Sequence, residues 1–180
     1  MRRTLLILVM LIVLVVSICC SLQAAIGIGV EFIGQIPFLT VNSNWGNIGG
    51  EVGIGLSYQS FSGMSLSYLW YGVNGKYYIP IPVLGAGQYL YLGGGIIGLY
   101  ISYSGSYLGT VVAASGSATG GLILGGLEYS LASLGLPLVI FGGADYVSIT
   151  KIEVTIGGVT VELPFAMSTF GTHLGIRWVF

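Results

Sequence analysis

The sequence predicts an all-β fold, namely a closed antiparallel up-and-down barrel that crosses a membrane. Three observations predict it. The 180-residue chain is 54% hydrophobic and only 6% charged, whereas ordinary soluble domains carry about 25% charged residues. Its 31 glycines are spread through apolar sequence and lower helix propensity. Apolar residues recur at every second position, which is the period of a strand. Only helices and closed barrels satisfy their backbone hydrogen bonds inside lipid, so a barrel is the solution that remains.

The first segment, residues 1–25, has the pattern of a secretory signal peptide. Arg2 and Arg3 give it a positive start, an uncharged apolar stretch runs from Thr4 to Cys20, and small or polar residues follow up to Ala25. The apolar stretch is long for a signal, so a retained membrane anchor stays open as an alternative. The expected organisation is a signal helix at 1–25 and one barrel domain at 26–180.

Charge and cysteine content exclude several classes of function. The only cysteines are Cys19 and Cys20, so a chain without its signal has no disulfide framework, thiolate metal site or cysteine nucleophile. Without Arg2 and Arg3, three basic residues remain against six acidic ones, and the net charge is −3. With no basic patch, nucleic acid is not expected as a partner. Nor is any cofactor expected.

The alternation divides the barrel domain into eight expected strands. They cover residues 25–32, 47–59, 63–79, 88–102, 107–115, 119–131, 138–156 and 159–180. The Asn74–Gly75 pair is a hairpin signal, so ten strands are an alternative. Short turns at 60–63, 103–106 and 133–137 are expected on one side of the membrane. Longer loops at 34–46 and 80–87, a tip at 115–117 and a hairpin at Gly157–Gly158 are expected on the other.

Side-chain alternation also predicts which residues face lipid and which face the lumen. The expected outer band is Ile26, Ile28, Val30, Ile48, Val52, Ile54, Leu56, Met64, Leu66, Ile176 and Trp178. Leu92 and Tyr100 are expected inside, where bulky side chains would close the lumen. An eight-stranded barrel is just wide enough for side chains to fill it.

Most of the ionisable residues of the barrel domain fall on the predicted lumen face, namely Glu31, Glu51, Glu128, Asp145, His173 and Arg177. Buried charges are costly unless they are paired. We therefore expect a plug of ion pairs centred on Arg177, with Glu31 and Glu128 as its partners. The alternative is a proton or cation path lined by carboxylates. His173 is the only histidine and has no partners at metal-ligand spacing, so neither a metal site nor enzymatic catalysis is expected.

The chain ends on "HLGIRWVF", in which a polar His173 is followed by Gly175 and then by Trp178 and Phe180 at alternating places. This ending resembles the assembly signal of bacterial outer-membrane proteins, and residues 26–180 resemble small barrels of the OmpA transmembrane-domain and OmpX type. The resemblance implies insertion in a bacterial outer membrane. It also implies recognition of the last strand by the barrel-assembly machinery through β-augmentation. The expected partners are this machinery and outer-membrane lipid, and the oligomeric state stays open.

The expected function is that of a non-enzymatic outer-membrane protein with a structural or surface-interaction role and a plugged lumen. One alternative is a narrow channel for ions or small solutes. Another is a secreted soluble β-sandwich, which would have to cover itself with very few charges.

Overall fold

The computed structural model describes residues 25–34, 36–61, 64–84, 87–107, 110–163 and 166–180. The expected signal peptide lies outside the described residues, apart from Ala25, which begins the first strand. The strands are β1 (Ala25–Ile33), β2 (Ile36–Trp45), β3 (Ile48–Phe61), β4 (Met64–Pro80), β5 (Gln88–Tyr107), β6 (Thr110–Ser130), β7 (Leu138–Ile156), β8 (Val159–Leu163) and β9 (Met167–Val179), with 3₁₀ turns η1 (Pro82–Leu84) and η2 (Ala132–Leu134). Among the described residues, no helix is both long enough and apolar enough to cross a membrane.

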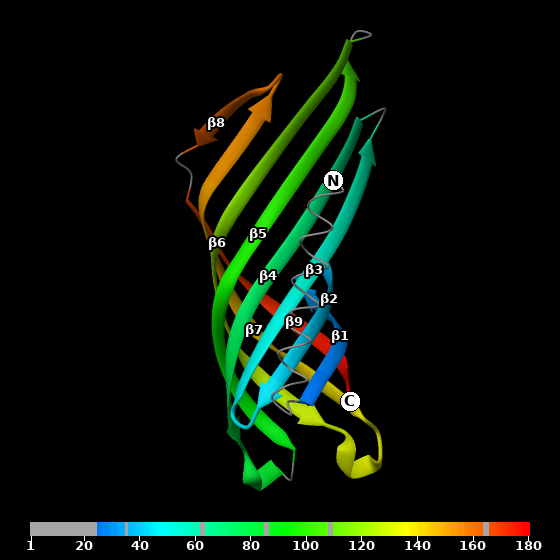
Figure 1. The fold of residues 1–180 in the computed structure, drawn as a ribbon, viewed down its shortest axis with the longest axis vertical. Coiled ribbons are helices and arrows are strands. Elements are labelled where there is room, and N and C mark those ends of the chain that lie inside the picture. Colours follow the sequence, from blue (N-terminus) through cyan, green and yellow to red (C-terminus); the bar gives the residue numbers. More distant parts are fainter. Residues whose placement is uncertain (1–24, 35, 62–63, 85–86, 108–109, 164–165) are drawn as a thin grey trace.

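Eight of these strands pair into one closed, barrel-like antiparallel ring (Figure 1). Strands β1 to β7 pair in sequence order, β9 pairs with β7, and β9 also pairs with β1 from Gly27–Val179 to Ile33–His173. The backbone N–H of Phe180 adds a hydrogen bond of 2.9 Å to the carbonyl oxygen of Ile26. Among the described residues, the ninth strand, β8, pairs with β7 alone and forms a hairpin with it beyond the ring.

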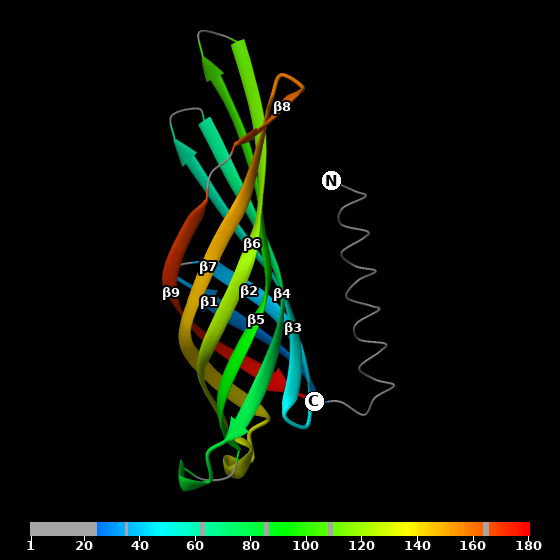
Figure 2. The same ribbon diagram turned by 90° about the vertical axis from the view of Figure 1, so that its left-hand side faces the viewer.

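The wall of the ring is uneven in height, as Figures 1 and 2 show. Strands β1 and β2 have 9 and 10 residues, close to the number that crosses a bilayer when a strand is tilted. Strands β5, β6 and β7 have 20, 21 and 19 residues. The hairpins β3–β4, β5–β6 and β7–β8 therefore project well beyond the β1–β2 hairpin at one end. The opposite end of the ring holds the two 3₁₀ turns, η1 and η2. It also holds the first residue of β1 and the last residue of β9.

The predicted number of strands agrees with the ring, but several of the predicted elements are wrong. The expected turn at 103–106 lies inside β5, and the expected last strand at 159–180 is divided into β8 and β9. Residues 34–46, expected as a loop, contain β2, and the expected tip at 115–117 lies inside the continuous strand β6. Between these two errors, β3, β4 and β5 run opposite to the predicted direction. The last residues of β3 and β5 consequently lie on the side of the Gly157–Gly158 hairpin, while η1 and η2 lie at the other end. The Asn74–Gly75 pair lies within β4, so it forms no extra hairpin.

Alternation along each ladder fixes the two faces of the sheet. Ile28, Val30, Ile48 and Leu56 are exposed on the outer face, as predicted. Met64 and Leu66, expected outside, lie on the inner face, because β4 alternates without interruption up from the buried Lys76. Leu92 and Tyr100, expected inside, lie outside, since Tyr91, Ile97 and Leu99 are the buried residues of β5.

Glycine allows β6 and β7 to approach closely. Gly126 and Gly143 are register partners on the inner face. A Cβ at Gly126 would collide with the carbonyl oxygen of Gly142, and a Cβ at Gly143 with that of Gly125. The close approach of the two backbones at this point depends on the absence of both side chains.

Candidate functional site

The centre of the lumen is the guanidinium of Arg177, whose side chain is 1% exposed. Its Nη2 donates to Oε2 of Glu51 and its Nη1 donates to Oε2 of Glu128, each at 3.0 Å. Glu51 lies on β3 and Glu128 on β6, so neither partner is on a strand that neighbours β9. The two ion pairs therefore cross the lumen instead of running along its wall.

A second cation completes this cluster. Nζ of Lys76 donates to Oε1 of Glu51 at 2.8 Å, and Nδ2 of Asn74 donates to the same oxygen at 3.2 Å. Lys76 is 4% exposed. The two acids Glu51 and Glu128 are thus balanced by the two bases Lys76 and Arg177. An arrangement of this kind offsets the cost of burying each charge.

A third polar group lies beside this cluster. Nδ1 of His173 is 3.5 Å from Oδ1 of Asp145, and Nε2 of His173 makes a short hydrogen bond with the hydroxyl of Tyr91. All three residues are buried, and they come from β9, β7 and β5. No described group of three or more His, Cys, Asp or Glu residues has the arrangement of a metal site.

Apolar and aromatic side chains fill the space around the charges. The Arg177 guanidinium lies 4.4 Å from the centre of the Phe141 ring, and Nζ of Lys76 lies 5.2 Å from the Tyr91 and Phe141 rings. Such contacts stabilise buried cations. The buried cluster that continues along the lumen comprises Tyr78, Tyr91, Ile97, Leu99, Ala118, Leu122, Leu124, Val139, Phe141, Val147 and Ile149.

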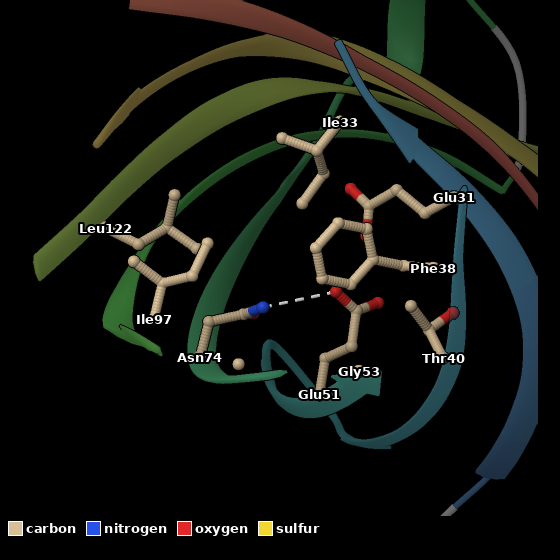
Figure 3. A pocket seen from close by; sticks show the side chains of 10 residues that line it. Glu31, Ile33, Phe38, Thr40, Glu51, Gly53, Asn74, Ile97 and Leu122 are labelled. Atoms are coloured by element: carbon tan, nitrogen blue, oxygen red, sulfur yellow. Dashed lines mark hydrogen bonds between the residues drawn. The ribbon is translucent and has the colours of Figure 1, made fainter. Parts of the chain in front are cut away.

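Glu31 on β1 stands apart from these pairs. Glu31 is 4% exposed, and its carboxylate forms no salt bridge with any described residue. It lines a cavity of about 20 Å³ together with Glu51, Thr40 and Asn74 (Figure 3). A cavity of this size holds about one water-sized group. Figure 3 shows Glu31 and Glu51 reaching into it from different strands, with Asn74 directed toward Glu51.

The structure places every predicted lumen residue of the charge network inside the ring, but it changes the pairing. Arg177 contacts Glu128, as expected, and Glu51 in place of Glu31. Lys76 is absent from the predicted network because "VNGK" has the pattern of a turn. The signal that could have found it is the alternation of Lys76 with the outward-facing Val73, Tyr77 and Ile79.

The residues of the predicted assembly signal also divide between the two faces. Trp178 and Phe180 are exposed on the outer face, whereas His173 and Gly175 are buried. A Cβ at Gly175 would overlap the ring of Phe141, so the glycine leaves the space that this ring occupies against Arg177.

The outer face of the sheet changes character along the height of the ring. Around β1, β2 and the lower parts of the long strands its exposed residues are apolar, and they include Ile28, Val30, Leu39, Ile48, Val73, Leu92, Ile96, Ile123, Leu127, Leu174 and Ile176. On the projecting hairpins the outer face is polar. Ser65 and Ser104 are hydrogen-bonded there at 3.0 Å between their hydroxyls, and Thr155 and Thr160 at 2.7 Å.

The charged residues of the projecting part follow the same pattern. Nζ of Lys151 lies 3.0 Å from Glu153 and 3.1 Å from Glu162, and all three side chains are well exposed. Hydrogen bonds to Glu153 and Glu162 raise the pKa of the Lys151 ammonium. A register shift between Thr119 and Gly120 turns these charges outward and turns Ile152 inward. At the end around β1 and β2, the outer face of the sheet is therefore apolar and the inner face carries the charges. On the projecting hairpins the outer face carries the charges and the inner face is apolar.

Comparison with known proteins gives similarity in fold. No family model matches the chain, and no curated protein sequence matches it. A major outer membrane protein from Thermus thermophilus matches with a TM-score of 0.57 at 14% identity, over 87% of this chain and 99% of that one. Ail, the attachment invasion locus protein of Yersinia pestis, solved with the heparin analogue sucrose octasulfate, matches with a TM-score of 0.53 at 17% identity, over 87% of this chain and 96% of that one.

Neisserial surface protein A matches with a TM-score of 0.51 at 14% identity, over 87% of this chain and 94% of that one. Identities at this level establish fold alone. The chain therefore has the fold of small bacterial outer-membrane β-barrel proteins, which agrees with the resemblance found in its sequence.

Proposed function

We propose that this protein is an integral outer-membrane β-barrel with a side-chain-plugged lumen and a structural or surface-interaction role. The observation that carries the proposal is the inversion of polarity along the sheet. The apolar outer band encircles the part of the ring that contains the ion pairs, as in a barrel that faces lipid outside and shields charge inside. The polar outer face of the projecting hairpins is suited to water.

This polarity also supports an orientation. The apolar band lies toward the end that holds both chain ends of the ring, and the hairpins β3–β4, β5–β6 and β7–β8 project beyond it. In the bacterial barrel plan the longer connections face the cell exterior. We therefore place the hairpins outside the cell and the first and last residues of the ring in the periplasm. The partners in this proposal are outer-membrane lipid and the barrel-assembly machinery, which would contact the outward-facing Trp178 at the end of β9 and Phe180 directly after it.

The filled lumen supports a plug over the alternative of a narrow channel. The cation–π contacts of Arg177 and Lys76 place aromatic rings directly against the ion pairs. The ladder also runs without a break around eight strands, which argues against two facing sheets and so against a soluble sandwich.

The proposal is tested by expressing the full chain in a diderm host, separating inner and outer membranes, and running unheated and boiled samples on a gel. We expect the protein in the outer-membrane fraction and a shift in mobility on boiling, because a closed ring resists detergent until it is heated. Recovery in the soluble periplasmic fraction, with the same mobility before and after boiling, would overturn the proposal.

A further inference from the structure

We propose that the inner face of the projecting hairpins binds an acyl chain of a membrane lipid, which reaches this face over the low β1–β2 hairpin. The inference rests on the outer-membrane position proposed above, and it adds a ligand and a binding surface to that position. The charge cluster around Arg177 takes no part in it.

The first argument is the composition of this surface, the inner hairpin face. On β4, β5, β7 and β8 its residues are apolar or aromatic, and on β6 they are small. They are Met64, Leu66, Tyr68, Trp70, Leu99, Ile101, Tyr103, Ala114, Gly116, Ala118, Ile152, Val154, Ile156, Val159, Val161 and Leu163. Several are well exposed, among them Ile156 at 59% and Val161 at 53%. An exposed apolar surface with a polar surround is typical of a binding site.

The second argument is that the ring is open beside this face. β2 pairs with β3 only as far as Gly55, and β1 pairs with β9 only as far as His173. Beyond these residues, the described part of β3 pairs with β4 alone and that of β9 with β7 alone. The wall is therefore low between β3 and β9, while the other hairpins rise beyond it (Figures 1 and 2).

The third argument is continuity with the lipid-facing band. Phe32, near the top of β1, is 48% exposed on the outer face, and the inward-facing Ile33 and Ile36 at the same hairpin are half-buried. On the strands that flank the low part of the wall, Leu56 of β3 is 69% exposed and Phe170 of β9 is 83% exposed. An acyl chain can therefore pass from the band to the inner hairpin face along apolar side chains.

The chemistry of the face favours an acyl chain over a protein partner. A peptide brings backbone N–H and C=O groups, which need hydrogen-bond partners when they are buried. The side chains of the inner hairpin face offer only the hydroxyls of Tyr68 and Tyr103. A second copy would present the outer face of its own hairpins, which carries serine, threonine and charged residues. An acyl chain has no polar group to satisfy, so the hydrophobic effect alone drives its burial there.

Trp70 provides the test, because it lies on the inner hairpin face beside Gly55, where the ladder with β2 ends. The other two tryptophans of the chain, Trp45 and Trp178, are replaced by Phe. The full chain is then folded into phosphatidylcholine vesicles whose acyl chains either carry bromine atoms or lack them. Bromine quenches an indole that it contacts. We expect Trp70 to lose most of its emission in the brominated vesicles.

Matched substitutions separate lipid on this face from lipid outside the wall. Ile101→Asp places a charge on the inner hairpin face, on the strand next to that of Trp70, and should abolish most of the quenching. Ser102→Asp places the same charge on the outer face of the same strand and should leave the quenching unchanged. If Ile101→Asp fails to fold, Leu66→Asp makes the same comparison with Ser65→Asp on β4.

Equal emission of Trp70 in the two kinds of vesicle would overturn the proposal and leave the face to a protein partner. So would quenching that neither Ile101→Asp nor Leu66→Asp reduces, because its source would then be lipid outside the wall. Ile54→Trp, in a chain whose own tryptophans are all Phe, tests the membrane position separately. Quenching at Ile54→Trp without quenching of Trp70 contradicts the lipid site alone, whereas an unquenched Ile54→Trp contradicts the outer-membrane position.

Discussion

Arg177 and Glu51 are joined by a 3.0 Å ion pair although β1 and β2 separate their strands in the ring. Because Arg177 also holds Glu128 on β6, one side chain ties β9 to two distant parts of the wall. A planar guanidinium suits this role, since it can donate to two carboxylates in fixed directions. The paired side chains are buried, and their energetic importance is best seen by removing one partner.

Substituting Arg177 by Met should destabilise the folded protein by about 3–5 kcal/mol, because Glu128 would be left buried without its only cationic partner among the described residues. The measurement is the urea midpoint in micelles. Lys151→Met is the matched control, since Lys151 also bridges two glutamates but does so on the exposed hairpin. Its midpoint should stay close to that of the wild type. Equal losses in the two variants would contradict the assignment of Arg177 as the centre of the plug.

Placing Arg at Ile54 tests the position of the lipid-facing band. Ile54 lies on the outer face between Leu39 and Tyr71. An arginine there should cost roughly 2–4 kcal/mol if the residue faces the middle of the bilayer. Ser102→Arg, on the polar outer face of the projecting hairpins, should cost far less. The comparison is made by folding both variants into liposomes, and similar stabilities would show that the inversion of polarity does not mark the membrane boundary.

Phe180→Ala should slow insertion more than it lowers final stability, because Phe180 directly follows β9, the strand that the assembly machinery is expected to recognise. Phe170→Ala is the control: Phe170 lies in β9 on the same outer face and is 83% exposed, but it precedes the motif. Pulse-chase labelling in cells would follow the appearance of the heat-modifiable form. If both variants insert at the wild-type rate, the ending of the chain has no special part in assembly.

Gly143→Ala should destabilise the ring by about 1–3 kcal/mol, because the added methyl group would collide with the backbone of β6. Gly121→Ala is the matched substitution at a glycine where a Cβ would meet nothing within 4 Å. It should be neutral or stabilise the protein by up to about 1 kcal/mol, since alanine has less freedom to lose on folding. In denaturant titrations only Gly143→Ala should lose stability, and an equal or larger loss in Gly121→Ala would refute the packing argument.

The sequence predicted the fold class and the face of most lumen residues because both follow from a period of two. It failed where that period was masked. Residues 34–46 contain Pro37 and several polar side chains, which are typical of loops, yet Thr40, Asn42 and Ser43 are buried residues of β2. In β6 the small residues around Ser115 suggested a tip. There the outer face carries polar side chains and the inner face carries small ones, so the usual contrast between an apolar outer face and a polar inner face is lost.

The pairing of charges depended on strand order, which single-strand patterns do not contain. Because β2 was not predicted, the predicted strand 47–59, which carries Glu51, lies directly beside the first strand. It also runs in the direction opposite to that of β3 in the structure. Lys76 was not predicted to face the lumen because Asn74–Gly75 has the pattern of a turn. In the structure both residues are paired within the long β3–β4 and β4–β5 ladders, so no turn forms. The identity of the lumen residues was thus predictable from the sequence, while their partners required the register.

Planar-bilayer recording of the wild type and Arg177→Ala tests the plugged lumen most directly. Removing the guanidinium takes away the group that fills the centre of the lumen and leaves Glu51 and Glu128 without their shared partner. The account predicts that the wild type is nearly silent and that the variant shows new or larger cation-selective openings. Steady conductance of the wild type, unchanged in Arg177→Ala, would contradict the plug and favour a channel.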